Sequence, residues 1–318
     1  MSKNEKHSGG SKSKATQAGR KTWLILIVSI IVLVGLVASV LLIFKPFQKS
    51  SAYRETAFAE QEPGVVKAGE KIQINDYELG LIEIEAVPGV PKNTYDLNAF
   101  RYDENGYKVY YLNDELASCE GIDLSEYQGE VDFEQVKASG IDYVMLRVGG
   151  RGYGEEGTIY PDDNFLPYYT GAKEAGLSVG VYFFSQAASV EDGIEEAEYT
   201  LDAIKGLEID YPVVFDWESI PDDEARTDNV TGEELTDITL AFLQTVEKAG
   251  YTPMWYTNTS HLYYKYDVAR LKNYDLWIAD YGDYPSAYYY FTMWQYTKTS
   301  FVPGIEGDVD INICFKNY

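Results

Sequence analysis

The chain has 318 residues, 45% of them hydrophobic and 15% aromatic, which excludes a disordered protein and allows at least one buried core. Residues 1–49 carry eight Lys/Arg and one acid, whereas the other 269 residues carry 18 Lys/Arg against 50 Asp/Glu, a net charge near −32. Nucleic acid is excluded as a partner, because phosphate binding requires a basic surface.

The few histidines and cysteines restrict the chemistry further. His7 and His261 are the only histidines, so neither a histidine-rich zinc site nor a Ser-His-Asp triad is expected. Cys119 and Cys314 are too few for a disulfide scaffold and lack metal-ligand spacing, although outside the cell they are able to form one bridge. Carboxylates remain as the acid–base groups, and the sequence indicates no metal and no cofactor.

An apolar segment near the start predicts a membrane anchor. Residues 23–44 are 22 consecutive residues without a charge, and a helix of this length spans roughly 33 Å at about 1.5 Å per residue. Six Lys/Arg precede it in residues 1–22, so the positive-inside rule predicts a cytoplasmic basic tail, one transmembrane helix and an extracellular remainder. The alternative is a cleaved signal peptide, but the apolar run exceeds the usual ~7–15 residues and no small-residue cleavage site follows it. A single-pass protein of the cell membrane is therefore expected.

Residues 45–120 are predicted to form a juxtamembrane spacer and a small β-rich module. Short strands are predicted at 77–86, 100–102 and 107–112, and the Asn105-Gly106 pair between the last two is a strong hairpin signal. No chemistry is indicated here, and the module is interpreted as a stalk that holds the remainder away from the membrane.

From residue 121 to residue 318, strands alternate with amphipathic helices, which predicts an α/β fold built from parallel βαβ units. Helices are predicted from 164 to a stop at Gly176, from 189 to near Gly206, and from a capping box at 231–234 to a stop at Gly250. The eight predicted strands are 121–123, 143–149, 178–185, 212–218, 252–258, 275–281, 291–297 and 308–315. This pattern predicts a modified TIM-like β/α barrel whose last strands, with little helix between them, close it by hairpins.

The strand 212–218 ends in two acids and is the first candidate for chemistry, because active residues of β/α barrels lie at the carboxyl ends of the strands. Alternate strand residues share a face, so Asp216 and Glu218 point one way and Trp217 the other. Two carboxylates this close cannot both ionise freely, so one pKa should rise and keep a proton available for a leaving group. Glycoside hydrolysis uses such a pair. The alternative is a pair of solvated acids on an ordinary loop.

Three further acids end strand-like runs, namely Asp123, Asp280 and Asp310. Each of them alone is also explained as a turn or cap residue. Aromatic side chains near the strand ends are candidates for stacking on sugar rings, although aromatics within strands are more often core residues. The candidates for substrate binding are Asp280 and the rings of Tyr127, Tyr182, Tyr256, Trp277, Tyr281, Trp294 and Tyr296.

Six segments after residue 120 carry a resemblance to a known family. They are GIDLSEYQG (121–129), DNF (163–165), GAKEAGLSVGVYFF (171–184), VVFDWE (213–218), WQYT (294–297) and GDVDIN (307–312). In this order they resemble glycoside hydrolase family 25, the lysozymes of the Chalaropsis type. The pair Asp-x-Glu alone is a weak signal, whereas six segments in the right order are specific.

The resemblance implies a modified β/α barrel that hydrolyses the β-1,4 bond between N-acetylmuramic acid and N-acetylglucosamine in peptidoglycan. Glu218 is similar to the proton donor of the family. Asp216 matches the partner acid, which either attacks as a nucleophile or steadies an intermediate formed by the substrate's own acetamido group. Asp123 and Asp310 match the other two acids of the cleft. A membrane-anchored bacterial lysozyme is therefore expected, with glycan strands as its partner, and the sequence identifies no protein partner.

Two other functions share part of this pattern. A catalytically silent cell-wall-binding or assembly module would use the same cleft, but all four family acids are present. A chitinase-like hydrolase shares the Asp-x-Glu ending but carries a longer run of alternating aspartates before it, and Val214 stands where the next acid would lie. The sequence favours an active N-acetylmuramidase.

Overall fold

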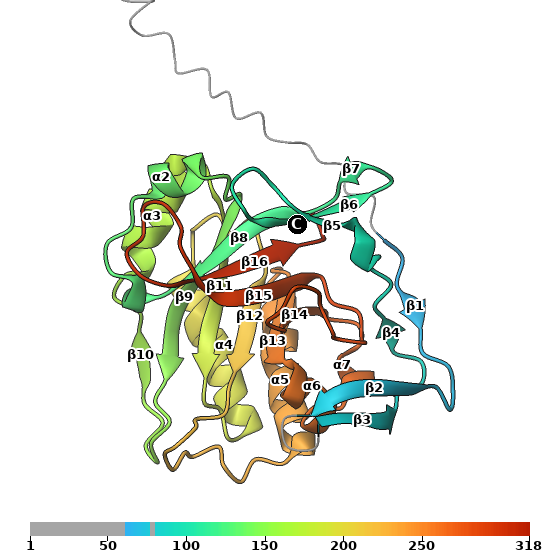
Figure 1. Cartoon of the computed structure of the whole chain (residues 1–318). Helices are drawn as coiled ribbons and strands as arrows, with labels where there is room; N and C mark the ends of the chain where they lie inside the picture. The colour runs from blue at the N-terminus through green and yellow to red at the C-terminus, as the bar shows by residue number, and fades with distance from the viewer. Residues whose placement is uncertain (1–60, 77–79) are drawn as a thin grey trace, which may run out of the picture. The chain divides into compact units, whose positions relative to one another are not determined.

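Eight strands form a closed, mixed β-barrel in the computed structural model, which describes residues 61–76 and 80–318 (Figure 1). The strands are β8 (Cys119–Leu124), β9 (Tyr143–Arg151), β11 (Ser178–Ser185), β12 (Val213–Trp217), β13 (Pro253–Asn258), β14 (Asp275–Ala279), β15 (Met293–Ser300) and β16 (Val309–Cys314). From β8 to β15 each strand is parallel to the next, whereas β16 is antiparallel to both β15 and β8 and closes the ring. The eight predicted strands and the closure by a final hairpin are confirmed.

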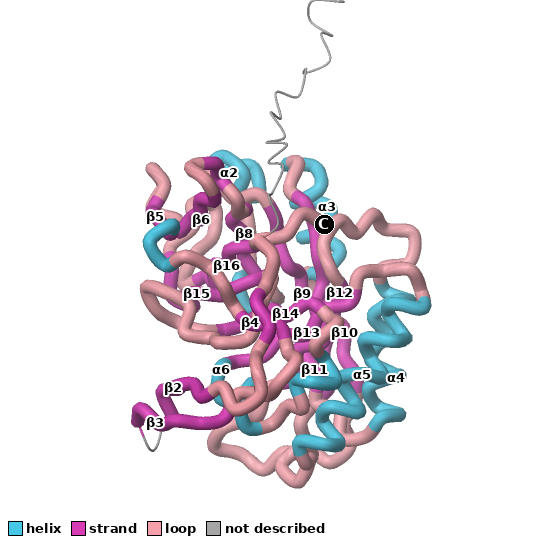
Figure 2. The backbone as a smooth tube through the Cα atoms, turned by 90° about the vertical axis from the view of Figure 1, so that its right-hand side faces the viewer, coloured by secondary structure: helices cyan, strands magenta, loops and turns pink. Residues whose placement is uncertain are grey.

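Helices cover the outer face of the parallel strands (Figures 1 and 2). The helix α3 (Phe165–Ala175) ends at Gly176, whose φ of 79° is left-handed and suits glycine. The helix α5 (Gly232–Lys248) begins with the predicted capping box, because Thr231 and its partner three residues later exchange hydrogen bonds. The other helices are α2 (Phe133–Ala138), α4 (Val190–Ala203), α6 (Thr259–Tyr264), α7 (Val268–Leu271) and the 3-10 turns η1 (Leu97–Ala99) and η2 (Glu126–Gln128). A short strand, β10 (Ile159–Pro161), is antiparallel to the end of β9.

Side chains alternate between the interior of the barrel and its outer face, which divides the core into two clusters. On β12, Val213, Phe215 and Trp217 face outward, and the ring of Phe215 lies 5.1 Å from that of Phe242 on α5. Fully burying such a side chain contributes about 1.5–3 kcal/mol. The interior is filled by Tyr143, Met145, Tyr182, Val214, Met254, Tyr256, Trp277, Ala279, Met293 and Cys314. Because the interior is packed, ligands are directed to the mouth of the barrel.

The segment before the barrel is β-rich, as predicted. The hairpin around Asn105-Gly106 is confirmed as β5 (Phe100–Tyr102) paired with β6 (Lys108–Leu112). The predicted strand 77–86 corresponds to β3 (Gly80–Glu85), which pairs with a strand that the sequence did not predict, β2 (Lys71–Asp76); residues 77–79 lie outside the described residues. The remaining short strands are β1 (Gly64–Val65), β4 (Pro91–Lys92) and β7 (Glu115–Leu116).

This β-rich segment covers the side of the barrel where β14, β15 and β16 follow one another with little helix. The hydroxyl of Tyr95 donates to the carbonyl of Phe291 at 2.8 Å. The ring of Phe100 lies 5.5 Å from that of Trp294 on β15. In the described residues the segment thus shares one hydrophobic core with the barrel, in place of the helices that cover the other strands.

The predicted cytoplasmic tail (1–22) and transmembrane helix (23–44) lie outside the described residues. In residues 61–76 and 80–318, no helix is long and apolar enough to cross a bilayer. The predicted start of the barrel at residue 121 falls within β8.

Cys119 on β8 and Cys314 on β16 are direct register partners on two antiparallel strands. Partners in this geometry have Cα atoms about 4.5–5.5 Å apart, a distance that a disulfide spans. Both are free thiols in the structure, so the bridge that the sequence suggests is not formed there. Burial raises the pKa of Cys119 to about 12, which keeps its thiol protonated.

Candidate active site

A cavity of about 190 Å³ opens at the mouth of the barrel, where the parallel strands end. Its walls carry the four acids predicted from the sequence and four of the predicted aromatic rings. The lining consists of Asp123, Asp216, Glu218, Asp310, Tyr127, Tyr182, Tyr256, Trp277, Ser125, Arg147, Phe184 and Gln295. Fold closure therefore gathers residues that lie almost 190 positions apart in the chain.

Asp216 on β12 and Glu218, the residue directly after this strand, both line the cavity, as strand alternation predicts. Trp217 between them points outward and is buried, and its Nε1 donates to the carbonyl of Ala187 at 3.2 Å. Asp216 is the register partner of Tyr256 on β13. The two acids therefore stand on a rigid strand end with an aromatic ring beside them.

Gln295 on β15 is the centre of the polar network in the cavity. Asp123 and Asp310 lie opposite each other as register partners of β8 and β16. The Nε2 of Gln295 donates to Asp123 Oδ2 at 2.9 Å and to Asp310 Oδ2 at 3.3 Å. Its Oε1 accepts from the hydroxyls of Tyr256 at 3.1 Å and Tyr281 at 3.0 Å. These four bonds fix the orientation of the amide and connect two acids with two tyrosines.

Asn312 on β16 supports Asp123 from deeper in the barrel. The Nε1 of Trp277 donates to Asn312 Oδ1 at 2.8 Å, and Asn312 Nδ2 donates to Asp123 Oδ2 at 2.8 Å. Indole nitrogen is a donor only, so it sets the orientation of the amide and leaves its NH₂ group for the carboxylate.

Burial is the first cause of a raised pKa in each of the four acids. The pKa values of Asp123 and Asp216 lie well above the usual range; the charge of Asp310 adds to the shift of Asp123, and that of Glu218 to the shift of Asp216. Burial and then the charge of Asp310 raise the pKa of Glu218, whereas the ammonium of Lys298 lowers it. Burial raises the pKa of Asp310 to about 6. Burial in the cavity therefore favours the protonated forms of these carboxyl groups, and a general acid must be protonated before it acts.

One oxygen of Asp216 is left for a ligand. Asp216 is 6% exposed, and its Oδ1 has no hydrogen-bond partner among the described residues. A buried polar oxygen without a partner costs free energy, so a hydrogen-bond donor on a bound substrate would relieve this cost.

Tyr127 forms an exposed part of the rim. Its side chain is 80% exposed, and the guanidinium of Arg147 lies 4.9 Å from the centre of its ring. Arg147 is itself fixed, because its Nε donates to Asp162 at 2.7 Å and its NH2 to Glu126 at 3.0 Å. Arg147 therefore holds the ring of Tyr127 in place, and the exposed part of the ring is accessible to a ligand.

Trp294 does not line the cavity, which corrects its prediction as a substrate-binding residue. It is fully buried on the outer face of β15, where its Nε1 donates to the carbonyl of Asp280 at 2.7 Å. Tyr296, two residues on, is also buried on this outer face. Strand alternation gives the inward position to Gln295 between them.

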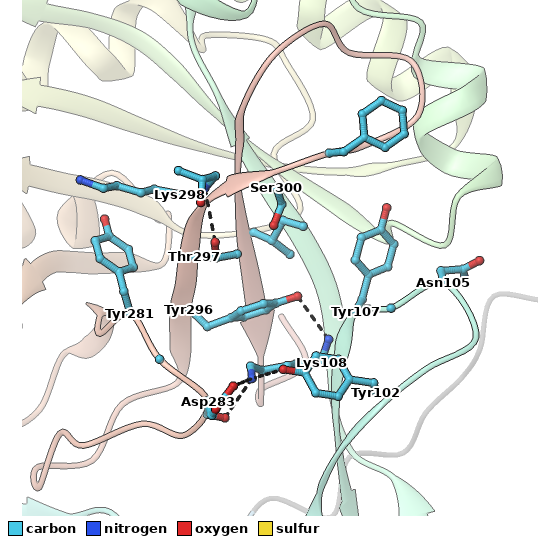
Figure 3. A pocket seen from close by; sticks show the side chains of 15 residues that line it. Tyr102, Asn105, Tyr107, Lys108, Tyr281, Asp283, Tyr296, Thr297, Lys298 and Ser300 are labelled. Atoms are coloured by element: carbon cyan, nitrogen blue, oxygen red, sulfur yellow. Dashed lines mark hydrogen bonds and ion pairs between the residues drawn. The ribbon is translucent and has the colours of Figure 1, made fainter.

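Asp280 also lies outside the cavity lining, and its carboxylate caps a turn. It accepts hydrogen bonds from the main-chain N–H groups of Ser286 and Ala287. Tyr281 contacts the cavity network through its hydroxyl on Gln295, while its ring lines a neighbouring groove (Figure 3).

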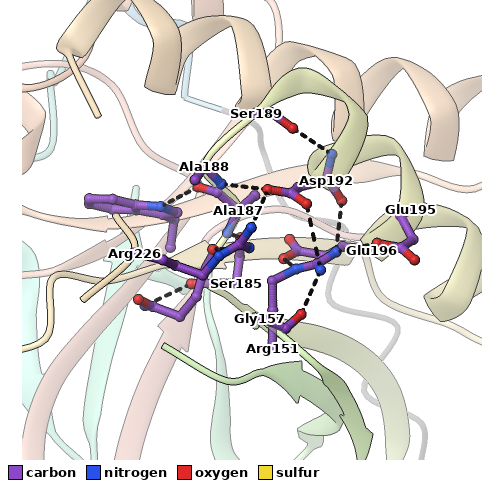
Figure 4. Close-up of polar contacts among 12 residues, drawn as sticks. Arg151, Gly157, Ser185, Ala187, Ala188, Ser189, Asp192, Glu195, Glu196 and Arg226 are labelled. Carbon is purple, nitrogen blue, oxygen red and sulfur yellow. Dashed lines mark hydrogen bonds and ion pairs between the residues drawn. The ribbon is translucent and has the colours of Figure 1, made fainter. Parts of the chain in front are cut away.

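The main chain at Glu218 is held by Gln186, which follows β11. The Nε2 of Gln186 donates to the carbonyl of Glu218 at 2.7 Å. Gln186 is held in turn, because its Oε1 accepts from Thr227 and its carbonyl from Arg226, each at 3.0 Å. Arg226 forms an ion pair with Asp192 on α4 at 3.1 Å (Figure 4).

Arg151 on β9 forms ion pairs with the same helix, α4. Its Nε lies 2.7 Å from Glu196 and its NH2 2.8 Å from Glu195, both on α4. Its NH1 lies 3.6 Å from Asp192, the residue that also pairs with Arg226 (Figure 4). The loop after β12 is thus tied to α4 through Arg226 and Asp192, and α4 is tied to β9 through the buried side chains of Arg151 and Glu196.

No group of three or more His, Cys, Asp or Glu side chains in the described part of the chain is arranged to hold a metal ion. The groups that line the cavity are carboxyl groups, an amide, a guanidinium group, a hydroxyl group and aromatic rings.

The comparison with protein families agrees with the geometry. The model of glycosyl hydrolases family 25 matches residues 122–305, more than half of the chain. The chain belongs to glycosyl hydrolases family 25. The family segment begins within β8 and ends before β16, so the hairpin β5–β6 and the other elements before residue 119 lie outside it.

Two relatives of this chain are named lysozymes. The chain is 31% identical over 194 residues to autolytic lysozyme of Clostridium acetobutylicum, a match that covers 60% of this chain and 54% of the relative. It is 29% identical over 210 residues to lysozyme M1 of Streptomyces globisporus, covering 62% of this chain and 68% of the relative. The chain thus spans only about half the length of the first of these family 25 relatives.

Among solved structures, the spore cortex lytic enzyme SleM of Clostridium perfringens has a similar fold. The TM-score is 0.53 at 25% identity, and the match covers 62% of this chain and 67% of that one. The fold of this chain is therefore similar to that of a solved lytic enzyme.

Several residues of this family 25 site were not singled out from the sequence, namely Ser125, Arg147, Phe184, Gln186, Gln295, Lys298 and Asn312. Gln295 and Asn312 are polar residues within strands whose other residues are mostly apolar. Buried polar side chains are uncommon, so this feature of the sequence could have marked both as site residues. Gln186 gives no such signal, because its role depends on a contact with a loop 32 residues further on.

Proposed function

We propose that this chain is a peptidoglycan hydrolase, an N-acetylmuramidase that cleaves the β-1,4 bond between N-acetylmuramic acid and N-acetylglucosamine. The observation that carries the proposal is the convergence of four acids with raised pKa values in one cavity of a family 25 barrel. The lysozyme names of two relatives support peptidoglycan as the substrate.

In this proposal Glu218 gives its proton to the oxygen of the leaving sugar. Burial raises the pKa of Glu218, which favours its protonated form, and its half-buried position just after the strand leaves it accessible to the glycosidic oxygen. Asp216 stands on the same face and offers the unpaired Oδ1. In its ionised form it either attacks the anomeric carbon or accepts a hydrogen bond from the substrate's acetamido group while that group attacks.

Asp123 and Asp310 act through charge and position. Both accept a hydrogen bond from Gln295, and in its ionised form each places negative charge in the cavity where the bond is cleaved. A positively charged, oxocarbenium-like transition state is stabilised by such carboxylates. The network of Gln295 and Asn312 keeps Asp123 in place during the reaction.

The test is digestion of purified cell walls with the full chain, kept in a mild detergent. The expected product is a new reducing end at N-acetylmuramic acid, identified by borohydride reduction and mass spectrometry. A new end at N-acetylglucosamine would indicate a glucosaminidase instead. No new reducing end would contradict hydrolysis and favour a silent wall-binding module.

We also propose that residues 23–44 anchor the chain in the cell membrane, with residues 1–22 in the cytoplasm and the barrel outside. The uncharged run and the basic residues before it support this proposal. A chain expressed in bacteria should stay in the membrane fraction after a carbonate wash, and protease added to spheroplasts should degrade the barrel. Recovery in the soluble fraction, or full protection from protease, would contradict it.

A further inference from the structure

An open groove of about 630 Å³ lies between the hairpin β5–β6 and strand β15. Figure 3 shows Tyr281 and Lys298 on one side of it and Asn105 and Tyr107 on the other. The hairpin residues precede residue 122, where the family match begins. One wall of the groove therefore lies outside the family 25 segment.

A buried lysine, Lys108, holds the hairpin wall of the groove in place. Lys108 is 4% exposed, and its Nζ donates to the hydroxyl of Tyr102 at 2.7 Å and to the carbonyl of Asp283 at 2.9 Å. Its main-chain N–H donates to the hydroxyl of Tyr296 on β15 at 3.2 Å. These contacts fix the hairpin to the barrel, so the groove exists before a ligand enters and little ordering is needed on binding.

The lining has the chemistry of a sugar-binding surface. Three aromatic side chains at the groove are largely exposed: Tyr102 at 61%, Tyr281 at 50% and Phe301 at 75%. Exposed rings provide flat apolar surfaces for the faces of sugar rings. Neutral hydrogen-bonding groups lie beside them, namely Asn105, Thr297, Thr299 and Ser300. Rings together with amide and hydroxyl groups fit N-acetylated hexosamines, which carry both apolar faces and neutral polar groups.

The groove lies next to the catalytic cavity, because Tyr281 of its lining contacts Gln295 of the cavity. The hydroxyl of Tyr281 bonds to Gln295, the amide that holds Asp123 and Asp310. The ammonium of Lys298 lies 5.5 Å from the ring of Tyr281 and lowers the pKa of both Glu218 and Asp310. Tyr281 and Lys298 line the groove, and Tyr281 is joined to the lining of the cavity by its hydrogen bond to Gln295, so a glycan strand that extends past these two residues from the acids would enter the groove.

We infer that this groove binds N-acetylhexosamine residues of the same glycan strand, more than two sugars away from the bond that is cleaved. The inference rests on the proposed function for the identity of the strand. Its consequence is a preference for long glycan strands, supplied by a hairpin outside the family 25 segment.

The experiment compares two lengths of peptide-free glycan strand, a tetrasaccharide with one bond to cleave and an octasaccharide. Phe301→Ala and Tyr102→Ala are made singly and together in the full chain. For the double variant, kcat/KM on the octasaccharide should fall about tenfold, the usual scale for losing an exposed aromatic contact, and kcat/KM on the tetrasaccharide should stay unchanged. Leu166→Ala is the matched control, since this side chain is 56% exposed but lies on α3.

Circular dichroism checks that each variant folds, and Phe301→Ala alone serves if loss of the Tyr102 hydroxyl disturbs the hairpin. Unchanged kcat/KM on both lengths would overturn the inference, as would an equal loss on both. A loss seen only on strands that carry peptide stems would also overturn it and indicate peptide binding.

A binding measurement separates this inference from the proposed function. In the Glu218→Gln background, calorimetric titration with the octasaccharide should give a Kd about tenfold weaker for the Phe301→Ala chain. If the wild type cleaves neither substrate, the proposed function is wrong. The titration still shows whether the groove binds the octasaccharide. Equal Kd values with and without Phe301 would overturn the inference whatever the enzymatic result.

Discussion

The side-chain amide of Gln186 donates a hydrogen bond of 2.7 Å to the main-chain carbonyl oxygen of Glu218, the proposed proton donor. Gln186 is fully buried and is held by Thr227 and Arg226 from the loop after β12. The position of the general acid therefore depends on a residue that does not line the cavity. Gln186 is a positioning residue, because it acts on the reaction only through Glu218.

Replacing Gln186 by Met should lower kcat by about 10- to 100-fold with little change in KM, because a small displacement of a catalytic group costs up to ~10²-fold in rate. Steady-state kinetics on solubilised glycan strands measures both constants. Gln244→Met, an exposed position on α5, is the control for the substitution itself. A wild-type kcat in the Gln186 variant would show that the contact is only structural.

Glu218→Gln should lower kcat by about 100-fold or more, the usual scale for loss of a general acid. The amide keeps the size of the side chain, so the fold should be unchanged by circular dichroism. The measurement is the release of reducing ends from cell walls by equal amounts of the folded wild type and variant. Full lytic activity in the variant would remove Glu218 from its proposed role.

Asp216→Asn should stabilise the fold at neutral pH while it reduces activity. Burial raises the pKa of Asp216 above its usual 3.8, so the folded state keeps a proton that the unfolded chain releases. The contribution of this group to stability is complete below about pH 3.8 and is lost as the pH rises through its folded pKa. The neutral amide does not suffer this loss.

Thermal unfolding of the two proteins from about pH 4 to pH 7 measures the difference. The variant should have the higher Tm near pH 7, by roughly 2–4 °C for each kcal/mol gained, and the difference should shrink toward pH 4. Asp163→Asn, at an exposed position, is the control. A variant that is less stable than the wild type near pH 7 would mean that Asp216 is charged and stabilised in the fold.

Lys298→Met should shift the pH dependence of activity toward higher pH. The positive charge of Lys298 lowers the pKa of Glu218 and of Asp310, so its removal raises both values. A general acid with a higher pKa stays protonated to higher pH, and the alkaline limb of the kcat/KM profile should move up by about half a unit at low salt. Lys248→Met on α5 is the control, and added salt should reduce the shift. An alkaline limb that stays in place or moves down would contradict the role of this charge.

Cys119 and Cys314 should form a disulfide when the chain is exported to an oxidising compartment. They are register partners on neighbouring antiparallel strands, so the bridge needs little backbone movement. Peptide mass spectrometry of unreduced protein, exported by bacteria and alkylated before digestion, should find the two joined. A reduced sample gives the reference masses, and two alkylated thiols in the exported protein would contradict the bridge.

The sequence by itself determined the local features of this protein. The period of two in β12 placed Asp216 and Glu218 on one face, since that property needs only the geometry of a single strand. The capping box at Thr231 and the glycine at 176 marked helix ends through contacts within a few residues. The order of strands and helices was sufficient for the barrel, because parallel βαβ units have few arrangements.

Only the tertiary structure decided which residues from different elements are in contact. Trp294 and Gln295 are neighbours in the same strand, and only the closure of the barrel and the packing of Phe100 show which one faces outward. The contact of Gln186 with Glu218 and the wall that the hairpin β5–β6 gives to the groove join residues far apart in the chain. Periodicity carries no information about such pairs, because they are fixed by how complete elements pack and not by the spacing within one element.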